Sequence, residues 1–102
     1  MKNLVLITRT DTQQRLADTL HTLPPVRGFT FTPVEGHGPQ ATHDPSVSAR
    51  DAVVGYTPHV RVDILLEDAD VEPVLAALGL ADGGLRGRCI YWVTPVERHG
   101  RF

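Results

Sequence analysis

The stretch that decides the fold is His59-Val60-Arg61-Val62-Asp63-Ile64-Leu65-Leu66. Its apolar side chains recur at every second position, at Val60, Val62, Ile64 and Leu66. A period of two is the pattern of a β-strand with one buried face. The sequence therefore predicts a strand here, with these four side chains in a core. The side chains between them, His59, Arg61, Asp63 and Leu65, would lie on the other face.

Working outward, three more segments predict strands. Residues 3–8 form a short run of branched apolar side chains, which is typical of a strand at the centre of a sheet. Residues 29–34 alternate with a period of two between Gly28 and the Glu-Gly-His-Gly run at 35–38. Residues 89–93 predict the last strand, which we expect to end at Pro95.

Two helices are predicted between these strands. Thr10 and Gln13 match a capping box, apolar leucines follow at helical spacing, and Pro24-Pro25 ends the helix. The second helix is expected to begin at Asp68 or Asp70 and to end at Gly79. We expect its buried face to hold Val71, Val74, Leu75 and Leu78.

The element order βαββαβ predicts an α+β, ferredoxin-like fold over residues 1–102 as a single domain. It would hold a four-stranded antiparallel sheet with two helices on one face and a long loop, about 38–58, between strands two and three. Two helices can cover only one face of such a sheet. We expect the other face to receive one of Phe29 and Phe31 and one of Tyr91 and Trp92, and to drive self-association.

Composition excludes several classes of protein. The 102 residues carry a formal net charge of −2, without the basic excess that nucleic-acid binding requires. No apolar run approaches the ~20 residues that span a bilayer, so the chain is not expected to be membrane-inserted. The N-terminal apolar stretch is too short for a signal peptide, and the single cysteine, Cys89, has no partner for an internal disulfide. These features favour the cytoplasm.

Three segments resemble the PII signalling superfamily, the family of nitrogen regulatory protein P-II. They are Val26-Arg-Gly-Phe-Thr-Phe-Thr-Pro-Val-Glu-Gly-His-Gly38, Val60-Arg-Val-Asp-Ile-Leu66 and Gly83-Gly-Leu-Arg-Gly-Arg-Cys-Ile-Tyr-Trp-Val93. Together with the ending Gly-Arg-Phe, they are most similar to a divergent group found beside genes for heavy-metal efflux pumps of the resistance-nodulation-division type. The resemblance covers nearly the whole chain.

This resemblance implies a homotrimer whose subunits bind adenine nucleotides (ATP, ADP or AMP) in the clefts between them. It also implies that the long loop 38–58 contacts a partner, here a membrane transporter for cations. Such proteins are sensors, so no enzymatic activity is expected. By the same resemblance Gly36, Gly38, Gly87 and Arg88 match cleft residues that approach phosphate, and Arg98 and Arg101 could add charge from the tail. Leu85-Arg86-Gly87-Arg88 stands where the family has a glycine-acid-glycine-lysine run.

Histidines suggest a second function. His37 and His43 lie on the long loop and His59 just beyond it, and imidazole is a ligand for copper and zinc. The alternative is that they are solvated polar residues, because their spacing matches no metal motif. A related CutA-like trimer that binds copper or zinc without sensing nucleotides is the main rival hypothesis. Cys89 is interpreted as a small buried hydrophobe, with copper(I) ligation as the alternative.

Overall fold

The computed structural model describes residues 1–37, 57–80, 85 and 89–102. Its four strands are β1 (Lys2–Arg9), β2 (Thr30–Gly36), β3 (Thr57–Leu66) and β4 (Ile90–Pro95). They form one antiparallel sheet in the order β2-β3-β1-β4. This arrangement confirms the predicted α+β, ferredoxin-like fold. Of the predicted loop 38–58, residues 38–56 lie outside the described ranges, and the last two residues belong to β3 because they pair with the end of β2.

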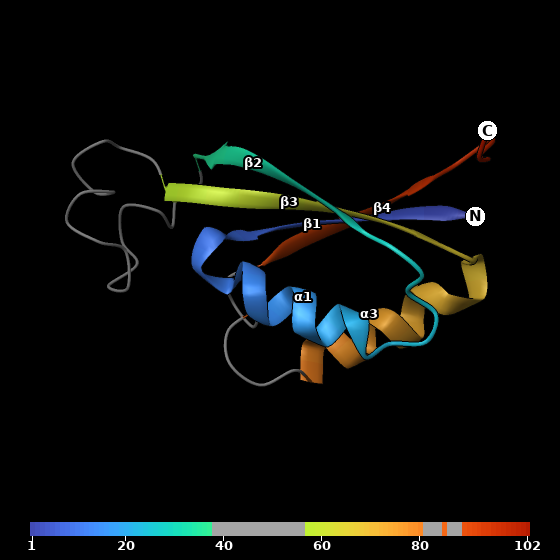
Figure 1. The fold of residues 1–102 in the computed structure, drawn as a ribbon, viewed down its shortest axis with the longest axis horizontal. Helices are drawn as coiled ribbons and strands as arrows, with labels where there is room; N and C mark the ends of the chain where they lie inside the picture. Colours follow the sequence, from blue (N-terminus) through green and yellow to red (C-terminus); the bar gives the residue numbers. More distant parts are fainter. Residues whose placement is uncertain (38–56, 81–84, 86–88) are drawn as a thin grey trace.

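The helices α1 (Gln13–His21) and α3 (Val71–Leu80) lie on the same face of the sheet (Figure 1). Each follows a single turn of 3-10 helix, η1 (Thr10–Thr12) or η2 (Asp68–Asp70). Gly79 does not end the second helix, which continues through Leu80. Within the described ranges, neither helix is long and apolar enough to cross a membrane.

The core lies between the two helices and the central strands. The predicted alternation of β3 is confirmed, because the side chains of Val60, Val62, Ile64 and Leu66 are each at most 2% exposed. In the register with β1, Ile64 lies opposite Leu4 and Val62 opposite Leu6, so these side chains point to the same face. The helices complete the core with five buried side chains, Leu16, Leu20, Val71, Val74 and Leu78.

The first helix begins differently from the prediction. Thr10 forms no capping box, because residues 10–12 are the 3-10 turn and its N-cap, Arg9, makes no side-chain capping bond. Instead the hydroxyl of Thr12 donates to the carbonyl of Arg9 at 2.8 Å and lies 2.9 Å from the hydroxyl of Thr8. Both threonines are buried. This pair ties the end of β1 to the helix entrance and satisfies two polar groups inside the core.

The expectation that a phenylalanine reaches the uncovered face was wrong, whereas the expectation that one of Tyr91 and Trp92 does so is confirmed. Phe31 lies opposite Val62 in the register, on the helix side of the sheet. The ring of Phe29 meets the ring of Phe31 edge-on, with 5.4 Å between their centroids, and both phenylalanines pack against the core. Trp92 therefore reaches the uncovered face without a phenylalanine. Tyr91 lies opposite Leu6 on the helix side but is 57% exposed, because β4 is an edge strand outside the buried core cluster.

The fold predicts that two substitutions of apolar residues by alanine differ strongly in their effect on the free energy of unfolding. Ile64→Ala removes a fully buried side chain and should lower the free energy of unfolding by about 2–5 kcal/mol. Leu80→Ala, at a side chain that is 86% exposed, should change it by less than about 0.5 kcal/mol. Urea denaturation followed by circular dichroism measures both. Similar losses in the two variants would contradict the assigned core.

Candidate functional site

The hairpin end of β2 and β3 brings together residues that the sequence had placed on either side of the long loop. Gly36 pairs with Thr57, and His59 lies two residues further along β3. A Cβ added at Gly36 would overlap the imidazole of His59. Any larger residue at position 36 would have to displace the histidine ring, which lies against the glycine backbone.

His37 and His59 occupy this same end of the sheet. His37 is exposed, and its Nε2 lies 3.1 Å from Glu35 Oε2. His59 is half-buried and lies opposite Arg9 in the register with β1. Among the described residues, no group of three or more histidine, cysteine, aspartate or glutamate side chains is arranged to hold a metal. Gly38 and His43, predicted for the same region, lie outside the described ranges.

The other predicted binding residues lie elsewhere. Gly87 and Arg88 are outside the described ranges, whereas Arg98 and Arg101 lie exposed in the tail that follows β4. The register places that tail beside the start of β1, because Lys2 pairs with Pro95 and the Val96 amide donates to the Met1 carbonyl at 3.1 Å. Both termini accordingly lie together at one end of the sheet in Figure 1, opposite the end where β2 meets β3.

These two groups of residues are thus separated within one chain. β1 spans the sheet from Lys2 to Arg9, which is roughly 23 Å for eight residues in extended conformation. Gly36, His37 and His59 are at the Arg9 end, and the arginines of the tail follow from the Lys2 end. The structure does not bring the tail arginines and Gly36 into one site within a single chain.

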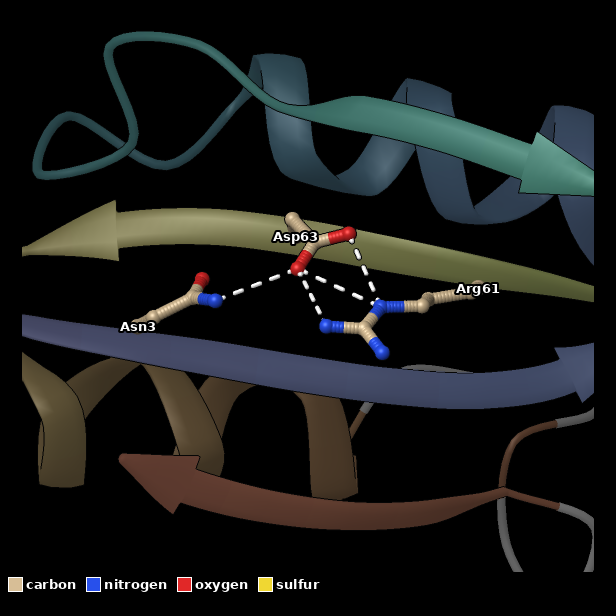
Figure 2. Close-up of polar contacts among 3 residues, drawn as sticks. All are labelled: Asn3, Arg61 and Asp63. Atoms are coloured by element: carbon tan, nitrogen blue, oxygen red, sulfur yellow. Dashed lines mark hydrogen bonds and ion pairs between the residues drawn. The ribbon is translucent and has the colours of Figure 1, made fainter.

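Sequence reasoning assigned no role to a polar cluster in the middle of the uncovered face (Figure 2). Asp63 accepts hydrogen bonds from Arg61 Nε and Nη2, at 3.1 and 3.0 Å, and from Asn3 Nδ2 at 3.1 Å. The Arg61 guanidinium also lies over Trp92, 5.9 Å from the ring centroid. The sequence pattern could have indicated this ion pair, because Arg61 and Asp63 are two residues apart in a strand and therefore lie on the same face.

Hydrogen bonding dominates the electrostatics of this cluster. The bond from Arg61 lowers the pKa of Asp63, partial burial opposes this, and the bond from Asn3 adds to the lowering. The carboxylate is therefore ionised near neutral pH, as its pairing with a guanidinium requires. Asn3 contributes its amide nitrogen, and its buried Oδ1 has no hydrogen-bond partner among the residues that the structure describes.

Cys89 matches the interpretation of a small hydrophobe. It packs against the core cluster, and burial raises the pKa of its thiol to about 11. A thiol with a raised pKa holds little thiolate near neutral pH, and the thiolate is the form that attacks electrophiles and binds metals. The described surroundings of Cys89 therefore suppress nucleophilic chemistry.

The Gly36–His59 contact predicts that the stability lost through a substitution at Gly36 is restored by a second substitution at His59. Gly36→Ala should displace the His59 ring and lower the free energy of unfolding by about 1–3 kcal/mol, because the new methyl group overlaps it. His59→Ala in the same chain should remove most of that loss. Gly28→Ala, where an added Cβ meets nothing within 4 Å, is the matched control. Denaturation midpoints measure all four proteins, and a loss unaffected by His59→Ala would contradict the contact.

The raised pKa of Cys89 predicts slow alkylation. At pH 8 the folded protein should react with iodoacetamide at least about tenfold more slowly than the same chain in urea, because the folded thiol is protonated and partly buried. Mass spectrometry over time gives both rates. Equal rates would show an accessible, ordinary thiol.

Comparison with known proteins agrees with this architecture. The family model described as "Protein of unknown function (DUF3240)" matches residues 1–102. The chain is 30% identical over 98 residues to the nitrogen regulatory protein P-II of Azospirillum brasilense, covering 95% of this chain and 87% of that protein. It superposes on a crystal structure of a DUF3240 family protein from Shewanella baltica with a TM-score of 0.76 at 24% identity, covering 99% of this chain and 94% of the other, which shows the shared fold. The chain therefore belongs to the DUF3240 family, within the PII-like superfamily.

Proposed function

We propose that this chain is a PII-type regulatory protein that assembles as a homotrimer, senses a small effector between its subunits and acts on a partner through residues 38–58. Its relationship to a nitrogen regulatory protein P-II supports a regulatory role in general. The proposal gives the protein no catalytic step and places it in the cytoplasm. The effector we favour is an adenine nucleotide, and the partner a cation efflux transporter.

One observation carries the intersubunit site: the predicted binding residues of one chain lie at opposite ends of its sheet. Gly36 stands at the hairpin end and the arginines at 98 and 101 follow from the other end. Any site that uses both groups needs two chains, and a cyclic assembly repeats such a contact at every interface. Glycine backbone can approach a phosphate closely, and guanidinium groups bind phosphate oxygens in pairs, so the two groups suit a nucleotide.

Signalling would follow from a shift in population. In sequence, residues 38–56 begin one residue after His37, which follows the Gly36–His59 contact, so an effector bound at this contact would lie next to the residue from which that segment starts. If the effector binds one conformation of this segment more tightly, it raises the population of that conformation. The partner then responds to the effector through its own preference for the same conformation.

A metal-binding trimer of the CutA-like kind is the second candidate. The observation that favours it is the placement of His37 and His59 at the same end of the sheet, beside the segment that contains His43. A threefold axis could supply three equivalent imidazoles, which is the ligand number of many zinc sites. Copper or zinc would then replace the nucleotide as the signal or as the cargo.

Calorimetric titration of the full chain with ATP, ADP and AMP tests the first candidate. We expect saturable binding of at least one nucleotide, and Arg88→Ala should weaken it at least about tenfold because a charge-assisted phosphate contact is lost. Arg27→Ala, an exposed arginine between α1 and β2, is the matched control and should bind like the wild type. His43→Ala should also bind nucleotide normally. A chain that binds none of the three nucleotides contradicts nucleotide sensing.

Titration with Cu(I), Cu(II), Zn(II) and Ni(II) under the same conditions tests the second candidate. Metal binding that survives Arg88→Ala and is lost in His43→Ala or His59→Ala would move the site to the histidines. The mass of the assembly, followed by light scattering in both titrations, reports on the trimer independently of either ligand.

A further inference from the structure

Glu35 and His37 flank Gly36, the last residue of β2, and lie on the side of the sheet that faces the helices. Strand alternation fixes this side, because Glu35 follows four residues after Phe31, which packs against the core. His37 lies on the same side, because its Nε2 is 3.1 Å from Glu35 Oε2. The carboxylate and the imidazole therefore form one pair at the helix side of the strand end.

His59 lies on the opposite side of the sheet from this pair. It shares a strand face with Arg61 and Asp63, whose side chains lie on the uncovered face in Figure 2. The two histidines are therefore not adjacent ligands of one ion within a chain, although both lie at the same end of the sheet. For a site that uses His37, the second ligand on the same side is Glu35.

The two donor atoms of the pair are already as close as adjacent ligands of one metal ion. Imidazole nitrogen and carboxylate oxygen bind a zinc-sized ion at about 2.0–2.2 Å. Two such atoms 3.1 Å apart subtend roughly 95–100° at the ion. That angle lies between about 90° in a tetragonal site and about 109° in a tetrahedral one. An ion can therefore replace the hydrogen between the two side chains with little movement of either.

The pair is open to an ion from solution and chemically suited to it. The side chains of His37 and Glu35 are 63% and 64% exposed. Coordination uses the lone pair of Nε2, which the neutral ring provides in the tautomer that carries its proton on Nδ1. The carboxylate adds a negative charge, which favours a cation. As an exposed ion pair, the two residues contribute little to folding, so their substitution leaves the core intact.

We infer that Glu35 and His37 form a chelating pair for a divalent transition-metal ion, with water in the other coordination positions. Cu(II) should bind most tightly, because affinity for nitrogen and oxygen donors rises to copper along the first-row series. The inference rests on the metal-binding candidate for the proposed function and assigns its ligands. Each chain holds both ligands and takes one ion, whereas three imidazoles around a threefold axis take one ion per three chains.

The tail offers a matched control with the same residue types at the same spacing. Glu97 and His99 are also two residues apart and exposed, but they follow β4 and belong to no strand. Within the described ranges, no hydrogen bond or ion pair joins them. They separate the effect of the arrangement at the end of β2 from that of sequence spacing alone.

Calorimetric titration of the full chain with Cu(II) tests the inference. Wild type should bind one ion per chain. His37→Ala and Glu35→Gln should each weaken this binding at least about tenfold, a loss seen even when only an outer-shell partner of a metal site is removed. His99→Ala and Glu97→Gln should bind like wild type, and so should His59→Ala.

Electron paramagnetic resonance of the Cu(II)-loaded chain gives a second readout that does not depend on affinity. The wild-type spectrum should show coupling of the copper electron to an imidazole nitrogen. That coupling should disappear in His37→Ala and persist in His99→Ala and His59→Ala. Circular dichroism of each variant checks that the fold is retained.

Three outcomes would overturn the inference. They are a wild type that binds no Cu(II), substitutions at Glu35 and His37 that leave binding unchanged, and one ion per three chains that is lost in His59→Ala. The last outcome would leave the metal-binding candidate standing, with its ligands on the uncovered face. Nucleotide sensing is tested by the separate titrations with ATP, ADP and AMP, and none of these outcomes changes that result.

Discussion

Two helices can cover one face of a four-stranded sheet and no more, and most features of this protein depend on that constraint. The covered face holds the aliphatic core, whose centre is the pairing of Ile64 with Leu4 and of Val62 with Leu6. The uncovered face cannot be equally apolar in a single chain in water. It carries instead a hydrogen-bonded polar cluster over its middle strands, with Val5 buried beneath and apolar side chains left exposed on β4.

The sheet also separates the parts that a regulatory role would use. Its long central strands hold the hairpin end, where Gly36 meets His59, away from the end where both termini lie. An antiparallel sheet is stiff along its strands, because every central strand is bonded on both sides. Residues at its two ends can share a ligand only through a neighbouring molecule, so assembly and sensing are linked in the function proposed for this protein.

The sequence predicted the fold well where the signal was periodic and poorly where it was local. Strand alternation in β3 and helical spacing in α1 both report burial, which the whole fold enforces, and both were confirmed. The capping box at Thr10 was wrong because residues 10–12 form a 3-10 turn, and the hydroxyl that contacts Thr8 at this helix entrance is that of Thr12. The prediction that a phenylalanine lies on the uncovered face was wrong because Phe29 and Phe31 both pack against the core beneath the helices. Of the predicted site residues, the structure brings Gly36, His37 and His59 to one end and leaves the tail arginines at the other.

By itself, the sequence determined the element order, the alternation of side chains along the strands and the excess of sheet surface over helix cover, because these follow from periodicity and chain length. Only the tertiary structure decided which side chains meet. The contact of Gly36 with His59 depends on the register of β2 with β3, and the stacking of Arg61 on Trp92 joins strands about thirty residues apart. Register and strand order set such distances, and no local pattern in the chain encodes them.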